Sequence, residues 1–231
     1  MTPLLILILG VQPETAVGTD LLYASATKAA GTTVHGLAQS VEWGVVGLLA
    51  AGSIPATVIT ICALWALGPA NPQTTALITT LLGIALLLTA IAVIFRDRIV
   101  RNYRARVGEL SGRRTHGLTI VIGVVLGVLV SISSVGAGAL GVTALIILYP
   151  RLPMARIIGT DIAHAVPLTL IAGMGHWLVG NVDWRILGSL LLGSIPGIVV
   201  GSYFATRAPE PLLRNLLAAV LGVVAIRLML Q

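Results

Sequence analysis

The sequence predicts an all-α polytopic membrane protein with two internal repeats. Hydrophobic residues make up 57% of the 231 residues and charged residues 10%, and the mean hydropathy is +1.02. Such a composition cannot give a soluble domain a polar surface. The apolar runs recur about every 25 residues, close to the ~20 residues that a helix needs to cross a bilayer. A transmembrane strand barrel would instead show short alternating segments.

The chain repeats itself without a gap at an offset of 141 residues. Four elements carry the match: Gly-Thr-Asp at 18–20 and 159–161, His35 and His176, Val-Glu/Asp-Trp at 41–43 and 182–184, and Gly-Ser-Ile-Pro at 52–55 and 193–196. A match of this length indicates a duplicated architecture. We expect a first transmembrane repeat in residues 1–95, a connecting loop in 96–116 and a second repeat in 117–231.

Apolar runs predict the membrane helices in order. A short run covers residues 1–9, and spans are expected at about 13–37, 41–67, 74–95, 154–179, 182–206 and 211–230. The second repeat also contains the segment 118–149, whose serine- and glycine-rich middle at 131–141 predicts a broken helix. The offset pairs Met1 with Val142, so we expect the first repeat to be truncated at its start.

Arginine predicts the orientation. The connecting stretch carries a net charge of +5, from Arg96, Arg98, Arg101, Arg104, Arg106, Arg113 and Arg114 against Asp97 and Glu109. Positive loops stay on the cytoplasmic side, and a stretch at a membrane face is not expected to bind nucleic acid. If 118–149 crosses the membrane twice, the two repeats are inverted; if it crosses once, they are parallel. We favour inverted repeats.

Ionisable residues inside the spans are the first candidates for a site, because a charge at membrane depth is expensive. Lys28 is the only lysine in the chain. At 100° per residue it shares a helix face with Asp20 and His35, where it could offset the charge of a bound anion. The alternative is a buried Lys28–Asp20 pair that only fixes packing.

The duplicated polar residues are candidates for substrate binding and proton coupling. We expect Thr19 and Thr160 to contact substrate. Proton coupling is expected from Asp20, Asp161, His35 and His176, since histidine titrates in the physiological range. The alternatives are aspartates that bond neighbouring backbone near a helix end and histidines that are satisfied at a helix interface.

The predicted break would expose backbone N–H groups and hydroxyls to an anionic substrate. Its candidate binding residues are Ser133, Ser134, Gly136 and Gly138; a packing kink is the alternative. Asp161 and His164 stand three residues apart, a metal-ligand spacing, but Tyr23 replaces His164 in the first repeat, so no metal is expected. The glycines at 193, 197 and 201 predict a close-packing helix face.

Together with the serine/glycine break before Tyr149, the repeated elements resemble the sulfite exporter TauE/SafE family over nearly the whole chain. The resemblance implies a permease for sulfur-containing anions such as sulfite, sulfoacetate and other sulfonates. Family members carry a glycine-rich segment before the position of Met1, which we expect to be missing here; in this chain only Val135–Leu140 matches that element.

We therefore expect a secondary transporter of small anions, coupled to protons or the membrane potential, with several passes through the cell (cytoplasmic) membrane. The expected partners are the lipid bilayer and a small anion, with a homo-oligomer left open, and no cofactor or catalytic residue is expected. A divalent-cation carrier and a non-transporting membrane subunit are the alternatives. An intramembrane enzyme would need Ser133 or Ser134 as nucleophile, with His164 or His176 as base.

Overall fold

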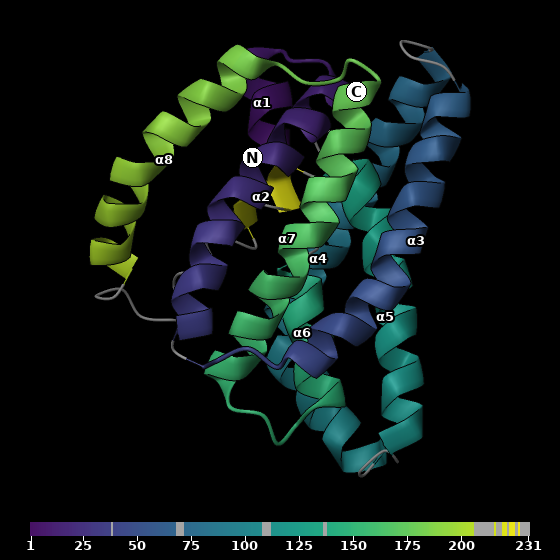
Figure 1. Ribbon diagram of the computed structural model, residues 1–231, viewed down its shortest axis with the longest axis vertical. Coiled ribbons are helices and arrows are strands. Elements are labelled where there is room, and N and C mark those ends of the chain that lie inside the picture. The colour runs from purple at the N-terminus through teal and green to yellow at the C-terminus, as the bar shows by residue number, and fades with distance from the viewer. Residues whose placement is uncertain are drawn as a thin grey trace.

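The computed structural model describes residues 1–37, 39–67, 72–107, 112–135 and 138–205, with a few separate residues between 215 and 226. The secondary structure of these parts is entirely helical, as predicted. The helices are α1 (Thr2–Leu9), α2 (Pro13–Leu37), α3 (Trp43–Leu67), α4 (Pro72–Val107), α5 (Gly112–Ser133), α6 (Ala139–Leu148), α7 (Met154–Leu178) and α8 (Trp184–Ala205). They form one bundle with α2 and α7 at its centre (Figure 1). The span expected at 211–230 lies outside the described ranges.

Within the described residues, α3, α4, α5 and α7 are long and apolar enough to cross a membrane. Helix α6 is apolar but has 10 residues, a length of about 15 Å. This length is about half the thickness of a hydrocarbon core of ~30 Å. Helix α1 is shorter still, with 8 residues. Several helices long enough to cross a bilayer are typical of a multi-pass membrane protein.

Two stretches are more helical than expected. Residues 96–107 continue α4, although we expected all of 96–116 to be a connecting loop. The stretch holds no glycine or proline and is rich in arginine, a good helix former. Likewise, α5 runs to Ser133 and α6 begins at Ala139, so the interruption is shorter than the expected 131–141. The hydroxyls of Ser131 and Ser133 donate to the carbonyls of Gly127 and Leu129, four residues back, and so stay inside the helix.

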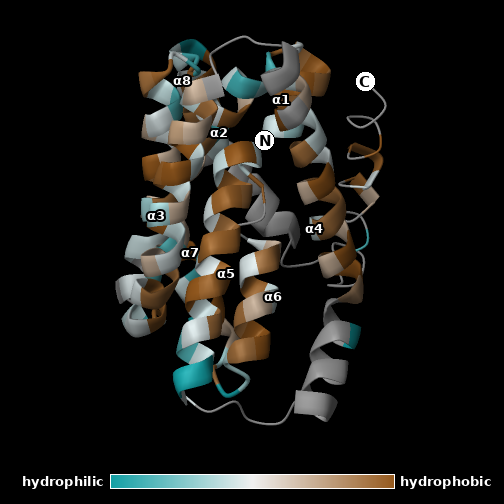
Figure 2. Cartoon of the chain, turned by 90° about the vertical axis from the view of Figure 1, so that its right-hand side faces the viewer, coloured by the Kyte–Doolittle hydropathy of each residue, from teal (hydrophilic) through white to brown (hydrophobic). Residues whose placement is uncertain are grey.

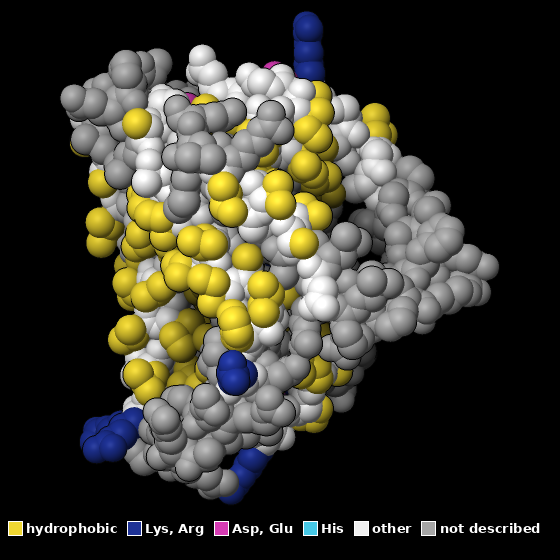
Figure 3. All heavy atoms as spheres, turned by 180° about the vertical axis from the view of Figure 1, so that it is seen from behind, with side chains coloured by type: hydrophobic (Ala, Val, Ile, Leu, Met, Phe, Trp, Pro, Cys, Tyr) yellow, Lys and Arg dark blue, Asp and Glu magenta, His cyan; other side chains and the backbone are white. Residues whose placement is uncertain are grey.

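Helices α5 and α6 form a hairpin that returns the chain to the end from which it came. The hydroxyls of Thr119, near the start of α5, and Tyr149, just after α6, are 2.9 Å apart, and the two helices lie side by side in Figure 2. Arg113, Arg114 and Arg151 therefore lie at one end of the bundle. In Figure 3, dark blue Lys and Arg side chains lie toward the upper and lower parts of the molecule, and hydrophobic side chains gather on the surface between them.

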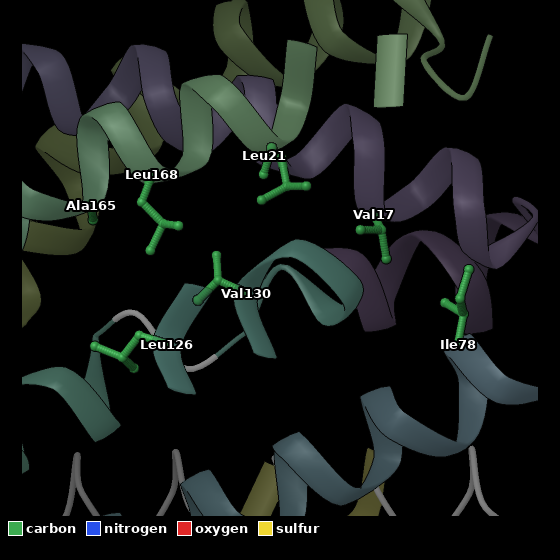
Figure 4. Close-up of a cluster of buried hydrophobic side chains, with 8 residues drawn as sticks. Val17, Leu21, Ile78, Leu126, Val130, Ala165 and Leu168 are labelled. Atoms are coloured by element: carbon green, nitrogen blue, oxygen red, sulfur yellow. The ribbon is translucent and has the colours of Figure 1, made fainter. Parts of the chain in front are cut away.

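The buried core joins helices from both halves of the chain. Its labelled side chains come from α2, α4, α5 and α7 (Figure 4): Val17, Leu21, Ile78, Leu126, Val130, Ala165 and Leu168. Many side chains on the outer surface are equally apolar, among them Ile59, Trp65, Val121 and Leu192. An exposed apolar belt around a buried core is the pattern expected when lipid surrounds the protein.

Gly52, which the 141-residue offset aligns with Gly193, makes a close helix contact. A Cβ on Gly52 would lie 2.0 Å from the carbonyl oxygen of Ile120, so α3 and α5 touch through backbone. Among the described residues, none comes within 4 Å of the corresponding point on Gly193, and the surroundings of Gly197 and Gly201 lie outside what the structure describes. The difference arises because α8 lies at the edge of the bundle beside α2 (Figure 1), whereas α3 packs along α5.

Candidate functional site

Helices α2 and α7 cross antiparallel, and the Gly of each Gly-Thr-Asp makes the contact possible. A Cβ on Gly18 would lie 2.1 Å from the carbonyl oxygen of Asn181, just beyond the C-terminal end of α7. A Cβ on Gly159 would lie 2.2 Å from the carbonyl oxygen of Ser40, just beyond the end of α2. Each glycine in the first third of one helix thus meets the chain just past the end of the other.

The threonines of the same motif make a matching pair of hydrogen bonds. The backbone N–H of Asp183, at the start of α8, donates to Oγ1 of Thr19 over 3.0 Å. The backbone N–H of Glu42, at the start of α3, donates to Oγ1 of Thr160, also over 3.0 Å. Donors and acceptors are both 141 residues apart. The structure therefore places Thr19 and Thr160, expected to contact substrate, where they hold the starts of two neighbouring helices.

The carboxylate of Asp20 caps the N-terminus of α1. Its Oδ2 accepts hydrogen bonds from the backbone N–H of Thr2 (2.8 Å) and from the hydroxyl of Thr2 (2.7 Å). The residue is 4% exposed. A carboxylate at a helix N-terminus is stabilised by the unpaired N–H groups and by the helix dipole. Asp20 thus caps a different helix, whereas the capping alternative had it bond neighbouring backbone.

Asp161, the repeat partner of Asp20, also points at a short helix but bonds differently. It is 3% exposed, and its Oδ1 has no hydrogen-bond partner among the described residues. A Cβ on Gly141, in the first turn of α6, would lie 2.0 Å from this oxygen. Gly138 caps α6 without a side-chain hydrogen bond. The carboxylate thus lies against the first turn of α6 with one oxygen unpaired.

Lys28 lies between the two aspartates. Across the α2–α7 contact, a Cβ on Gly173 would lie 3.1 Å from the backbone nitrogen of Leu22, and one on Gly31 3.4 Å from Cγ2 of Ile162. Lys28 stands between these two levels. Its ammonium interacts electrostatically with both Asp20 and Asp161. One partly buried lysine on α2 is therefore placed along the bundle between the carboxylates beside the two short helices.

His164 lies beside Asp161 and Lys28 and was not among the predicted site residues. Its ring is fully buried and interacts electrostatically with Lys28. Its Nε2 lies 2.9 Å from the hydroxyl of Ser53 on α3, while its Nδ1 has no partner in the described part of the chain. We considered His164 as a metal ligand or a base, and Ser53 only as part of a repeated tetrapeptide. The three-residue spacing from Asp161 was the available signal.

The two repeated histidines lie away from Lys28, toward opposite ends of the α2–α7 pair. Nδ1 of His35 is 2.9 Å from the hydroxyl of Ser40. Nε2 of His176 is 2.9 Å from the backbone carbonyl of Ser131, to which it donates. Both rings thus have local partners, as the interface alternative requires.

The residues expected to form an anion site at the break make separate contacts. The hydroxyl of Ser133 donates to a carbonyl in its own helix. Ser134 ends α5 in the left-handed region, with φ 55, and its buried hydroxyl has no partner among the described residues. Gly138 starts α6. Gly136 lies outside the described residues.

The described residues hold no group of three side chains suited to a metal ion. Asp161 and His164 supply two ligand atoms. The ammonium of Lys28 acts on both side chains, and its positive charge would oppose a divalent cation at this position.

A family model described as the sulfite exporter TauE/SafE matches residues 1–228. The chain belongs to the sulfite exporter TauE/SafE family. This TauE/SafE protein is 41% identical to the probable membrane transporter protein YjnA of Bacillus subtilis (strain 168), over 92% of this chain and 84% of the relative. It is 26% identical to the probable membrane transporter protein YdhB of the same organism, over 92% of this chain and 83% of the relative. No solved structure matches. The family resemblance is confirmed.

Proposed function

We propose that this TauE/SafE protein is a secondary transporter that moves a small anion across the cell membrane, with sulfite or an organosulfonate as substrate. The observation that carries the proposal is the place of Lys28. The only lysine of the chain lies mid-way along the central helix pair and acts on the aspartates beside two short helices. A charge held at membrane depth marks a substrate or ion site by default.

The surroundings of Lys28 suit an anion. An ammonium is a compact point charge that binds phosphate-like and sulfonate-like groups without demanding a fixed planar geometry. The short helices α1 and α6 direct their N-terminal ends toward the carboxylates that Lys28 faces, and helix N-termini attract negative charge. Discontinuous helices of this kind bind anionic groups in secondary transporters.

We further propose that the two halves are inverted repeats around this site. The antiparallel course of α2 and α7, helices whose bounds differ by 141 residues at both ends, supports this arrangement. So do the paired glycine contacts and the paired threonine hydrogen bonds. Inverted repeats allow one half to rock against the other around a central site. The end that carries Arg113, Arg114 and Arg151 would face the cytoplasm by the positive-inside rule.

Coupling to protons or to the membrane potential would drive the transport. Of the four residues expected to carry protons, Asp161 is the one with an unpaired buried oxygen. Asp20, His35 and His176 each have a hydrogen-bond partner. Their contacts therefore favour Asp161 as the coupling residue.

A divalent-cation carrier is the second candidate, because neither Asp161 Oδ1 nor His164 Nδ1 has a partner in the described part of the chain and both lie on one face of α7. The two candidates predict ligands of opposite charge and opposite effects of removing Lys28. An anion would stabilise the protein only when Lys28 is present, whereas a divalent cation would bind better once Lys28 is neutral.

The proposal is tested by thermal unfolding of the purified protein with sulfite, sulfate, sulfoacetate, taurine and methanesulfonate, and with chloride and Mn²⁺ as controls. A ligand at 100 times its dissociation constant stabilises the folded state by about 2.7 kcal/mol. We expect a selective shift with a sulfur-containing anion that Lys28→Met abolishes. Arg98→Met is the matched control, because it removes a positive charge at an exposed position. An unchanged anion shift in Lys28→Met, or a shift with Mn²⁺ alone, would refute the anion site.

A further inference from the structure

The two aspartates of the repeated Gly-Thr-Asp make different contacts, and this difference assigns them different roles. We infer that Asp161, and not Asp20, competes with the transported anion for the start of α6 and for Lys28, and that it gives way by taking up one proton per anion. The inference rests on the proposed anion transport. It names the coupling residue, the place where coupling occurs and the stoichiometry.

Asp20 is unsuited to this role because its contacts are structural. The backbone N–H and the hydroxyl of Thr2 both donate to the same carboxylate oxygen, at 2.8 and 2.7 Å. A proton on this carboxylate would weaken two charge-assisted hydrogen bonds and leave the end of α1 without its cap. Asp20 is therefore best kept ionised throughout transport.

Asp161 has no such bonds to lose at Oδ1. This oxygen is buried and unpaired within the described residues, and it lies against Gly141 in the first turn of α6. The first N–H groups of a helix have no partner within the helix, and Gly138 provides no side-chain cap. The carboxylate therefore lies where an oxyanion of the substrate would find both the helix N-terminus and Lys28.

Charge explains why the ionised Asp161 carboxylate and the transported anion exclude each other at this site. Lys28, from α2, is the charged group that acts on Asp161, and His164 lies one turn further along α7. Two anions beside a single ammonium repel each other. A proton from the aqueous phase, bound to a carboxylate oxygen of Asp161, removes one negative charge and frees Lys28. The anion leaves when that proton leaves, so one proton and one anion move together.

The test uses the full chain and methanesulfonate, a monovalent anion whose sulfonate stays ionised between pH 5 and pH 8. If one proton is bound together with the anion, the affinity of the wild type rises by about tenfold for each unit that pH falls above the titration of Asp161. Asp161→Asn, which resembles the protonated carboxyl, should bind without this pH dependence. In proteoliposomes it should exchange internal for external anion but lose acceleration by a proton gradient.

Asp20→Asn is the matched control. It should keep the pH slope of binding while lowering the melting temperature, because it weakens the cap of α1. A pH slope retained in Asp161→Asn, or lost in Asp20→Asn, would overturn the inference; a slope lost only in His164→Asn would move the coupling proton to that ring. If Asp161→Asn fails to fold, Asp161→Ser provides a second neutral side chain. Absence of anion binding by the wild type would instead refute the proposed function itself.

Discussion

Oδ1 of Asp161 lies only 2.0 Å from the point where a Cβ on Gly141 would stand. The carboxylate and the first turn of α6 can therefore be neighbours only while residue 141 is glycine. The position of the Asp161 carboxylate beside Lys28 depends on this contact. A substitution of Gly141 therefore disturbs the candidate site without removing a charge.

Gly141→Ala should displace the Asp161 carboxylate. We expect a loss of stability of about 1–3 kcal/mol from the forced rearrangement and a clear fall in anion-dependent thermal stabilisation. Gly193→Ala is the matched control, since no described atom lies within 4 Å of its added methyl group and alanine favours helix. Thermal unfolding with and without methanesulfonate measures both effects. Equal behaviour of the two variants would contradict the contact.

The glycines of the α2–α7 crossing should tolerate no larger residue. Gly18→Ala and Gly159→Ala would each place a methyl carbon 2.1–2.2 Å from a backbone carbonyl oxygen. Relieving this overlap would require the packed helix backbones to move apart, which costs much free energy. We expect poor expression or a large fall in melting temperature for both. Gly36→Ala, on the same helix as Gly18 but with open space around it, should fold normally. Fluorescence-detected size-exclusion chromatography provides the measurement.

The hydrogen bonds accepted by Thr19 and Thr160 should contribute equally to stability. Thr19→Val and Thr160→Val each remove an acceptor for a backbone N–H while preserving side-chain shape, and each should lower stability by about 1 kcal/mol. Thr33→Val is the control, because its exposed hydroxyl only donates back to Ala30 in the same helix. Chemical or thermal unfolding in one detergent compares the three. A large effect at one threonine and none at the other would contradict the proposed equivalence.

The hairpin of α5 and α6 predicts which residues share a side of the membrane. In a Cys62→Ser background, which removes the single cysteine, cysteines introduced at 113 and 151 should react with a membrane-impermeant maleimide from the same side. A cysteine at 185, beyond the other end of α7, should react from the opposite side. Labelling of intact cells and of inverted vesicles tests this. Labelling of 113 and 151 from opposite sides would contradict the hairpin.

Much of the helical layout is predictable from local sequence. The ends of α2 coincide with the expected 13–37, and α7 begins at the expected residue 154. These boundaries follow from proline, turn residues and the lengths of apolar runs. The extension of α4 through its arginines differs from the prediction, because a run of charges indicates a membrane boundary but does not by itself end a helix.

The sequence by itself determined that the chain is a membrane protein of the TauE/SafE family, with a single lysine and a repeated Gly-Thr-Asp among its apolar helices. Composition, spacing and local motifs carry that information. Only the tertiary structure decided that Asp20 is bonded by Thr2 whereas Asp161 has an unpaired oxygen against Gly141. The physical reason is that an offset of 141 residues makes the two aspartates equivalent in sequence, but their hydrogen bonds depend on which groups the antiparallel crossing of α2 and α7 brings within about 3 Å of each.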